Sequence, residues 1–259
     1  RDGAGVFHTL TGNQIACLML YHILTSLKEK GTLPKNGAVV KSVVSTELAR
    51  AICDDFGVAM VEVLTGFKFI GEKIQQFEET GSHTFLFGFE ESFGYLSGTQ
   101  VRDKDGVNAS LLLCEAACAC MDRGETLYDA LQAIYRRYGY YQERGVSVTL
   151  PGKDGAEKIQ RMMTAMRANP PKALAGVRVL AVRDFLRGAR VDASGAETAL
   201  DFPRSNVLYF ELEGGNWVCV RPSGTEPKIK LYIASKGENE ARAAELNAAL
   251  TEAARALLV

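Results

Sequence analysis

Strand-like and helix-like patterns alternate along roughly the first half of this 259-residue chain, and this alternation constrains the fold more than any other feature. Short apolar runs, typical of buried strands, are separated by longer segments whose apolar residues recur every three or four positions. The expected strands are 38–44, 58–63 and 84–88, and the expected helices are 11–30, 46–56, 67–79, 106–121 and 126–138. Strands that alternate with helices form βαβ units, so we expect an α/β domain with a mixed or mostly parallel sheet.

After about residue 140 the pattern changes to several strands and a long terminal helix. The expected strands are 146–150, 177–182, 207–212, 217–220 and 229–234, the expected helices are 157–166 and 238–257, and 188–195 is expected to be a loop. This order is typical of a small α+β domain with a sheet and helices on one face. We therefore predict two domains, at residues 1–145 and 146–259.

The helix expected at 106–121 is almost entirely apolar, which predicts that it lies in the core. The chain has six cysteines, mostly in apolar segments: Cys17, Cys53, Cys114, Cys118, Cys120 and Cys219. Their surroundings favour reduced core thiols over disulfides, which points to the cytoplasm. A zinc site is not expected, because the one C-x-C has no second ligand pair and no nearby histidine.

The overall charge and hydropathy exclude some classes of partner. The formal net charge is −1 at pH 7, and basic residues are scattered, so neither nucleic acid nor an anionic membrane is expected as a partner. No apolar run reaches the roughly 18 residues that a membrane-spanning helix needs. A charged content of 24% and a hydrophobic content of 47% are ordinary for a globular protein.

Residues 221–230 gather groups that suit a phosphate monoester. Arg221 offers a planar fork that matches phosphate oxygens, and Ser223 and Thr225 offer hydroxyls. Gly224 lets backbone N–H groups approach an anion closely. The segment lies between two strand-like runs and also carries Lys228 and Lys230, so it is expected to be a loop that joins two strands. An ordinary hairpin turn is the alternative, because Pro, Ser and Gly are common in turns.

A second polar stretch, 88–95, follows the strand expected at 84–88. It contains Glu90, Glu91 and Ser92 between two glycines. In open α/β sheets, ligands bind at the carboxyl ends of the strands, and carboxylates there can accept hydrogen bonds from sugar hydroxyls. The alternative is the first turn of a helix, where glutamate is favoured by the helix dipole.

Together, the two stretches resemble the phosphoglucomutase/phosphomannomutase family, the α-D-phosphohexomutases. Segments 10–14, 65–71 and 102–106 also resemble segments of this family, in the same order. The resemblance implies that the chain carries domains 3 and 4 of the family, which bind the sugar and the substrate phosphate. Within the family, Phe89, Tyr95 and the RDKDG run at 102–106 look most like the branch of bacterial phosphoglucomutases and phosphopentomutase-type relatives.

The resemblance assigns roles residue by residue. Arg221, Ser223, Gly224 and Thr225 would bind phosphate. Thr65, Gly66, Lys68, Glu90 and Ser92 would bind the substrate, with Lys68 near the transferring phosphoryl group as an auxiliary catalytic candidate. The family implies a sugar phosphate substrate, a hexose bisphosphate activator and Mg²⁺. The reaction moves phosphate between C1 and C6 (or C5) of the sugar and makes the enzyme an isomerase.

Two motifs of the family do not occur in this sequence: the catalytic serine loop and the aspartate-rich metal loop. We therefore expect no catalytic residue and no metal ligand here, and interpret the chain as the C-terminal part of a longer enzyme, inactive without domains 1 and 2. One alternative is a stand-alone phosphosugar-binding module. Others are a parent with phosphopentomutase-type activity and, since the terminal helix is long, a helical interaction protein.

Overall fold

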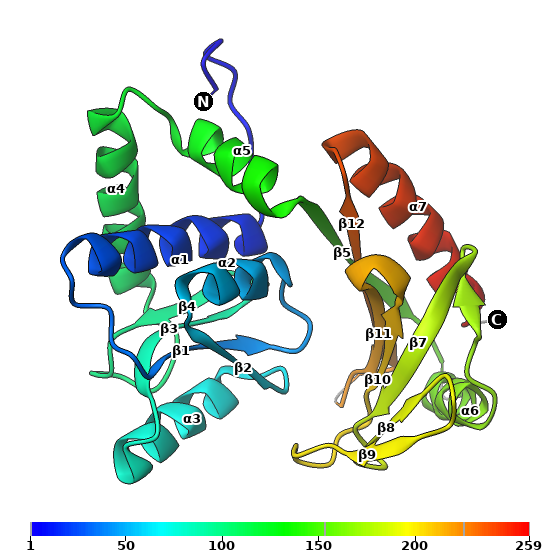
Figure 1. The fold of residues 1–259 in the computed structure, drawn as a ribbon. Helices are drawn as coiled ribbons and strands as arrows, with labels where there is room; N and C mark the ends of the chain where they lie inside the picture. The colour runs from blue at the N-terminus through cyan, green and yellow to red at the C-terminus, as the bar shows by residue number, and fades with distance from the viewer. Residues whose placement is uncertain (1, 153, 225, 259) are drawn as a thin grey trace. The chain divides into compact units, whose positions relative to one another are not determined.

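The computed structural model describes residues 2–152, 154–224 and 226–258, and the remaining residues are drawn as a grey trace in Figure 1. The chain divides into two compact units, Arg1–Gly139 and Tyr140–Val259, which are described separately. The sequence placed the domain boundary after residue 145, which lies inside the first strand of the second unit, β5 (Tyr140–Thr149). The limits of the functional domains remain a prediction.

The first unit is built on a four-stranded sheet in the order β2-β1-β3-β4. The strands are β1 (Gly37–Ser42), β2 (Ala59–Val63), β3 (Thr84–Glu90) and β4 (Gly94–Ser97). β1 pairs in parallel with both β2 and β3, so the predicted parallel arrangement is confirmed for these three strands. β4 was not predicted; it returns antiparallel to β3 and makes the sheet mixed.

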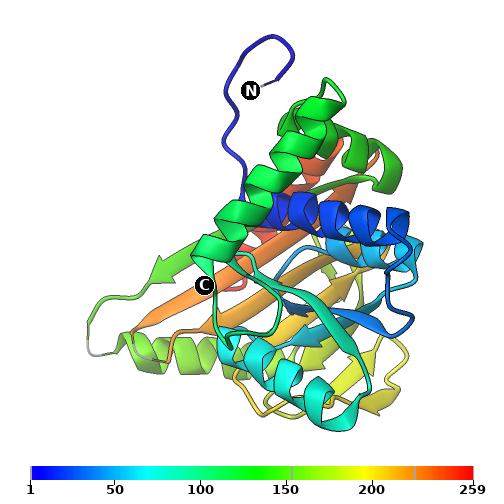
Figure 2. The same ribbon diagram turned by 90° about the vertical axis from the view of Figure 1, so that its left-hand side faces the viewer.

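Five helices surround this sheet, and all five were predicted. They are α1 (Gly12–Glu29), α2 (Leu48–Phe56), α3 (Phe67–Thr80), α4 (Gly106–Asp122) and α5 (Leu127–Tyr138). α3 covers one side of the sheet, and the other helices lie on the opposite side (Figures 1 and 2). Thr11 caps α1 as predicted, and its hydroxyl and the Gln14 side chain form a reciprocal capping box. α2 begins later than predicted, at Leu48, with Glu47 at its cap position.

The prediction that α4 lies in the core is wrong. Only three small residues of α4 are buried, whereas Val107, Leu111 and Met121 are 84%, 69% and 73% exposed. Cys114 and Cys118 on the same helix are also exposed. These five residues recur at spacings of four and three, so they form one apolar stripe along the helix, called the α4 stripe below. An apolar sequence pattern indicates that a helix can be buried, but it does not indicate which side of the helix other elements cover.

The second unit is an antiparallel sheet in the order β5-β12-β11-β10-β7-β8-β9, with β6 paired to β7. Its strands after β5 are β6 (Ala173–Leu174), β7 (Val177–Asp184), β8 (Ala189–Asp192), β9 (Glu197–Ala199), β10 (Leu208–Leu212), β11 (Asn216–Pro222) and β12 (Lys228–Gly237). All five predicted strands are confirmed. The loop predicted at 188–195 is wrong, since β8 lies within it and pairs with β7.

Two helices, α6 (Gly155–Ala168) and α7 (Glu240–Ala256), pack against this sheet. Met163 of α6 and Leu250 of α7 share one apolar cluster with Phe210, Val218 and Leu231 of the sheet. Since all of these strand residues point to the same face, the predicted α+β arrangement with helices on one face is confirmed. Among the described residues, no helix is both long and apolar enough to cross a lipid bilayer.

Candidate functional site

The carboxyl ends of the three parallel strands meet at one rim of the first unit's sheet. Ser42 at the end of β1 is aligned with Val63 at the end of β2, and Lys41 is aligned with Phe89 of β3. The segments that follow, 43–47, 64–66 and 91–93, therefore lie at the same edge. This edge is called the sugar rim below, and it contains four of the expected substrate ligands: Thr65, Gly66, Glu90 and Ser92.

Glu90 joins two of the predicted segments. It is the last residue of β3 rather than a loop residue, and its side chain is only 6% exposed. Its Oε1 accepts a hydrogen bond of 2.6 Å from the backbone N–H of Gly66, the cap residue of α3. Gly66 has φ 128°, a conformation that a residue with a Cβ rarely adopts. The carboxylate thus sits at the positive end of a helix and still has lone pairs for further donors.

Glu91 is held from a different side, by serines that sequence analysis missed. The hydroxyl of Ser42 donates to Glu91 Oε2 at 3.3 Å, and Ser42 and Ser45 form a hydroxyl pair of 2.8 Å. Both serines are fully buried. Two serines at the end of an apolar strand are the only signal in the sequence, and only the strand order shows that they reach Glu91.

The turn between β3 and β4 packs tightly against the start of α1. A Cβ added to Gly12 would come within 2.1 Å of the carbonyl oxygen of Glu91 and 2.9 Å of the backbone nitrogen of Phe93. The hydroxyl of Tyr95 donates to the carbonyl oxygen of Gly12 at 2.9 Å. The start of α1 therefore supports the turn directly, and glycine is required at position 12. The next side chains of the turn, Ser92 and Phe93, are exposed.

Lys68 lies in the first turn of α3, beside the sugar rim, and is exposed. Its Nζ lies 4.9 Å from the centre of the Phe69 ring. A second lysine near the rim was not predicted: Lys41 is fully buried within β1. Its Nζ contacts Glu47 at 2.8 Å and Glu62 at 3.2 Å, and Arg50 pairs with the same two carboxylates. Only Lys41 of this network is buried; its partners are partly exposed, and the ion pairs link β1 to β2 and to the start of α2.

The predicted phosphate loop is the turn between β11 and β12, as expected for a segment that joins two strands. Arg221, Lys228 and Lys230, however, belong to the strands themselves. Arg221 is aligned directly with Lys230 across the antiparallel pair. Their neighbours Val220 and Leu231 point toward α6 and α7, so Arg221 and Lys230 point to the opposite face.

Two like charges face each other at this position. Like-charged residues directly opposite in an antiparallel pair destabilise the sheet. Within the described residues, neither Arg221 nor Lys230 forms an ion pair, whereas the Nζ of Lys228 contacts Glu226 at 2.9 Å. The end of the β11–β12 hairpin is therefore a place where an anion would relieve a repulsion.

The turn itself, 223–227, is closed at its base. The N–H of Ser223 donates to the carbonyl oxygen of Lys228 at 2.7 Å. Gly224 is exposed, and a Cβ added there would have no atom within 4 Å. Thr225, the fourth expected phosphate ligand, lies outside the described residues. The described part of the turn leaves open space around the Gly224 backbone, as close approach of an anion requires.

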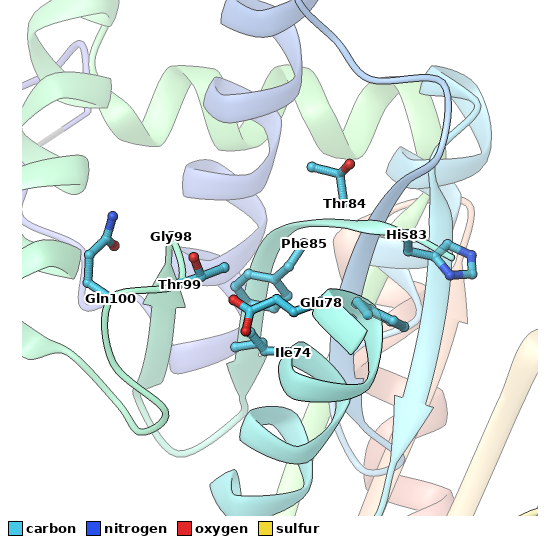
Figure 3. Close-up of a pocket in the computed structure, with 9 residues that line it drawn as sticks. Ile74, Glu78, His83, Thr84, Phe85, Gly98, Thr99 and Gln100 are labelled. Atoms are coloured by element: carbon cyan, nitrogen blue, oxygen red, sulfur yellow. The ribbon is translucent and has the colours of Figure 1, made fainter. Parts of the chain in front are cut away.

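The first unit also has a cavity of about 390 Å³, which is not part of the predicted site (Figure 3). It is lined by residues from the start of β3, the end of α3 and the segment after β4, among them Glu78, Thr84 and Thr99. It therefore lies at the end of β3 opposite to Glu90. Across residues 2–152, 154–224 and 226–258, no three His, Cys, Asp or Glu side chains are grouped to hold a metal ion.

Comparison with known proteins gives one consistent family. The model of "Phosphoglucomutase/phosphomannomutase, alpha/beta/alpha domain III" matches residues 11–138, and the model of "Phosphoglucomutase/phosphomannomutase, C-terminal domain" matches residues 159–253. Phosphoglucomutase of Staphylococcus haemolyticus is 35% identical over 240 residues, which cover 92% of this chain and 42% of that protein. Phosphoglucomutase of Staphylococcus aureus is 37% identical over 237 residues, with 91% and 42% covered. The chain thus spans less than half the length of these relatives.

Two solved structures share the fold. A putative phosphomannomutase from Thermus thermophilus has a TM-score of 0.60 at 20% identity, with 96% of this chain and 40% of that chain covered. Parafusin, a phosphoglucomutase from Paramecium, has a TM-score of 0.63 at 17% identity, with 96% and 42% covered.

Proposed function

Because the chain belongs to the phosphoglucomutase/phosphomannomutase family, we propose that it is the part of an α-D-phosphohexomutase that holds the sugar phosphate. The parent enzyme would be an isomerase that moves a phosphoryl group between C1 and C6 of a hexose, or C5 of a pentose. The second unit would hold the charged end of the substrate and the first unit its hydroxyls. Domains 1 and 2 of the parent would complete the enzyme.

One observation carries the phosphate assignment: Arg221 and Lys230 face each other without an ion pair of their own among the described residues. A phosphate dianion between them would replace a repulsion by two attractions, one of them bidentate. Ser223 and Gly224 stand next to them in the turn and would add a hydroxyl and backbone donors. Thr225 completes the proposed set by its match to the family motif.

At the sugar rim, we assign hydroxyl recognition to Glu90 and Ser92, with Thr65 and Gly66 beside them. The hydrogen bond from Gly66 fixes the direction of the Glu90 carboxylate. A carboxylate of fixed direction distinguishes hydroxyl positions, because hydrogen bonds weaken steeply with angle. Lys68 would neutralise charge on the phosphoryl group during transfer.

We propose that the parent enzyme uses Mg²⁺ and that a hexose bisphosphate activates it. The described residues of this chain do not fit a metal site, so any metal ligands would come from the rest of the parent. We expect the chain alone to show no mutase turnover. We also propose a cytoplasmic location, because the structure pairs none of the six cysteines in a disulfide.

The phosphate assignment is tested by NMR titration of the 259-residue chain with inorganic phosphate. Arg221→Ala should weaken binding more than tenfold, since loss of a charged bidentate contact costs about 1.5–3 kcal/mol. Arg221→Lys should restore binding only partly, because an ammonium lacks the planar fork. Arg178→Ala is the control, since Arg178 is an exposed arginine of the same sheet. If Arg221→Ala binds phosphate as tightly as the unsubstituted chain does, the segment is only a turn and the proposal fails.

The sugar assignment needs a second ligand, glucose 6-phosphate. Glu90→Gln should leave the affinity for inorganic phosphate unchanged and weaken binding of the sugar phosphate severalfold, because a neutral amide is the weaker acceptor. Equal losses for both ligands would point to a general structural change, and no loss for either would remove Glu90 from the site.

A further inference from the structure

Phe93 stands at the tip of the turn between β3 and β4, and it is an unusual residue for that place. Its side chain is 61% exposed, although it is a large aromatic. Its φ is +62°, the left-handed region that bulky residues rarely adopt. Both features cost free energy, and both would be removed by a glycine or an asparagine.

The surrounding structure holds this conformation in place. The start of α1 lies against the backbone of the turn, so close that a Cβ on Gly12 would be 2.9 Å from the Phe93 nitrogen. The residues that flank the turn, Glu90 and Gly94, are paired in the antiparallel ladder of β3 and β4. Because α1 and the β3–β4 pairing hold the backbone of the turn, the Phe93 side chain is exposed to solvent directly after Ser92.

We propose that Phe93 is a substrate-contacting residue whose ring packs against the C–H face of the sugar bound at the sugar rim. This inference rests on the proposed function. Binding sites for small molecules combine a few polar groups with aromatic walls, and Glu90 and Ser92 would supply only the polar part. The matching ligand is an aldohexose 6-phosphate in the pyranose form.

Stereochemistry adds a specificity role. When the ring hydroxyls are equatorial, as those at C2, C3 and C4 of glucose are, the faces of the pyranose at these carbons present C–H groups to an aromatic ring. An axial hydroxyl, as at C4 of galactose, interrupts one face with a polar group that would lose its water on packing. Packing of the Phe93 ring against this face would favour glucose 6-phosphate over galactose 6-phosphate, whereas packing against the opposite face would not distinguish the two.

The test is NMR titration of the full chain with glucose 6-phosphate, galactose 6-phosphate and inorganic phosphate. Phe93→Leu keeps apolar bulk but loses the ring. It should bind glucose 6-phosphate about three- to tenfold more weakly and phosphate equally well, with a smaller preference for glucose over galactose. In the unsubstituted 259-residue chain, nuclear Overhauser effects should connect the Phe93 ring protons with sugar C–H protons. Met121→Ala, which removes another exposed apolar side chain, should change none of these values.

Phe93→Gly separates a binding role from a structural one. Glycine adopts φ +62° without strain, so the melting temperature of the variant should equal or exceed that of the unsubstituted chain. The affinity of the variant for glucose 6-phosphate should fall. A marked loss of stability in Phe93→Gly, or unchanged binding in Phe93→Leu, would overturn the inference. If Glu90→Gln loses sugar affinity and Phe93→Leu does not, only this inference fails. If the unsubstituted chain binds glucose 6-phosphate no more tightly than phosphate, both this inference and the proposed sugar site fail.

Discussion

The two turns assigned to the substrate are built in opposite ways. The turn at 91–93 is fixed from several sides: Gly66 donates to Glu90, Ser42 donates to Glu91, and the start of α1 supports it from below. The turn at 223–227 is closed at its base by the Ser223–Lys228 hydrogen bond, and Gly224 stands in open space. The first depends on neighbours that are distant in sequence, and the second on residues within one hairpin.

This difference matches the two kinds of ligand. A hydroxyl is recognised by the direction of a hydrogen bond, so its acceptor must be held rigidly. A phosphate is attracted by charge over a longer range and accepts donors from many directions, so a local cluster of cations and N–H groups is sufficient. We infer that substitutions beneath the first turn act through folding, whereas substitutions at the second turn act on affinity.

The largest expected contrast is between two lysines, Lys41 beneath the first turn and Lys230 beside the second. Lys41→Ala removes a fully buried side chain together with its two ion pairs and leaves a cavity, so the free energy of unfolding of the first unit should fall by about 2–5 kcal/mol. Lys230→Ala removes an exposed lysine that faces a like charge and should change the stability of the second unit by less than about 0.5 kcal/mol. Urea denaturation measures both. Similar losses in the two variants would contradict the difference between the turns.

Two glycines give a smaller contrast. Gly12→Ala places a Cβ 2.1 Å from the Glu91 carbonyl oxygen, and the backbone must move, at a cost of about 1–3 kcal/mol. Gly224→Ala meets no atom within 4 Å and should stay within about 0.5 kcal/mol of the parent. Thermal unfolding followed by circular dichroism distinguishes the two. A stable Gly12→Ala variant would show that the first turn can shift freely.

The smallest expected effect at neutral pH is the loss of the Tyr95 hydroxyl, which is linked to an alkaline pH dependence of the first unit. Burial raises the pKa of Tyr95, and burial raises the pKa of Cys53 to about 12. In the unfolded chain these groups ionise near 10 and 9, so the folded state binds more protons above those values. Their contribution to stability is therefore complete below pH 9 and is lost as pH rises toward 12, by at most about 1.4 kcal/mol per pH unit for each group.

The pH dependence has its own control. Tyr95→Phe removes the hydroxyl that donates to Gly12, so it should lower stability at pH 8 by about 1 kcal/mol and flatten the loss above pH 10. The measurement is the free energy of unfolding from urea titrations at several pH values. An equally steep loss in Tyr95→Phe would assign the alkaline effect to other groups.

The sequence was informative wherever a feature is local. The capping residue Thr11, the apolar strands and the hairpin that carries Arg221 could all be predicted, because each is defined within a few neighbouring residues. The roles of Ser42 and Lys41 could not, since their partners are distant in sequence: Glu91 lies in the turn after β3, and Glu62 lies on β2. The alignment of Arg221 with Lys230 also depends on strand register, which the loop composition does not specify.

Two errors have the same origin. β4 was missed because the return of the chain after Glu90 depends on pairing with β3, and its four residues carry little signal of their own. α4 was assigned to the core because its composition was apolar, but only contacts with α1 and β4 decide which side is covered. In both cases the sequence described what a segment can do, and the neighbouring elements determined what it does.

The α4 stripe has a consequence for handling the protein at high concentration. With a formal net charge of −1 at pH 7 and an isoelectric point near 6.4, copies of the chain repel one another weakly in neutral buffers. An uncovered row of Val107, Leu111 and Met121, with the two exposed thiols of Cys114 and Cys118 between them, then favours self-association and oxidative cross-linking. Buffers above pH 8 with a reducing agent, or polar substitutions at Leu111 and Met121, should keep the chain in solution without disturbing the substrate-binding turns.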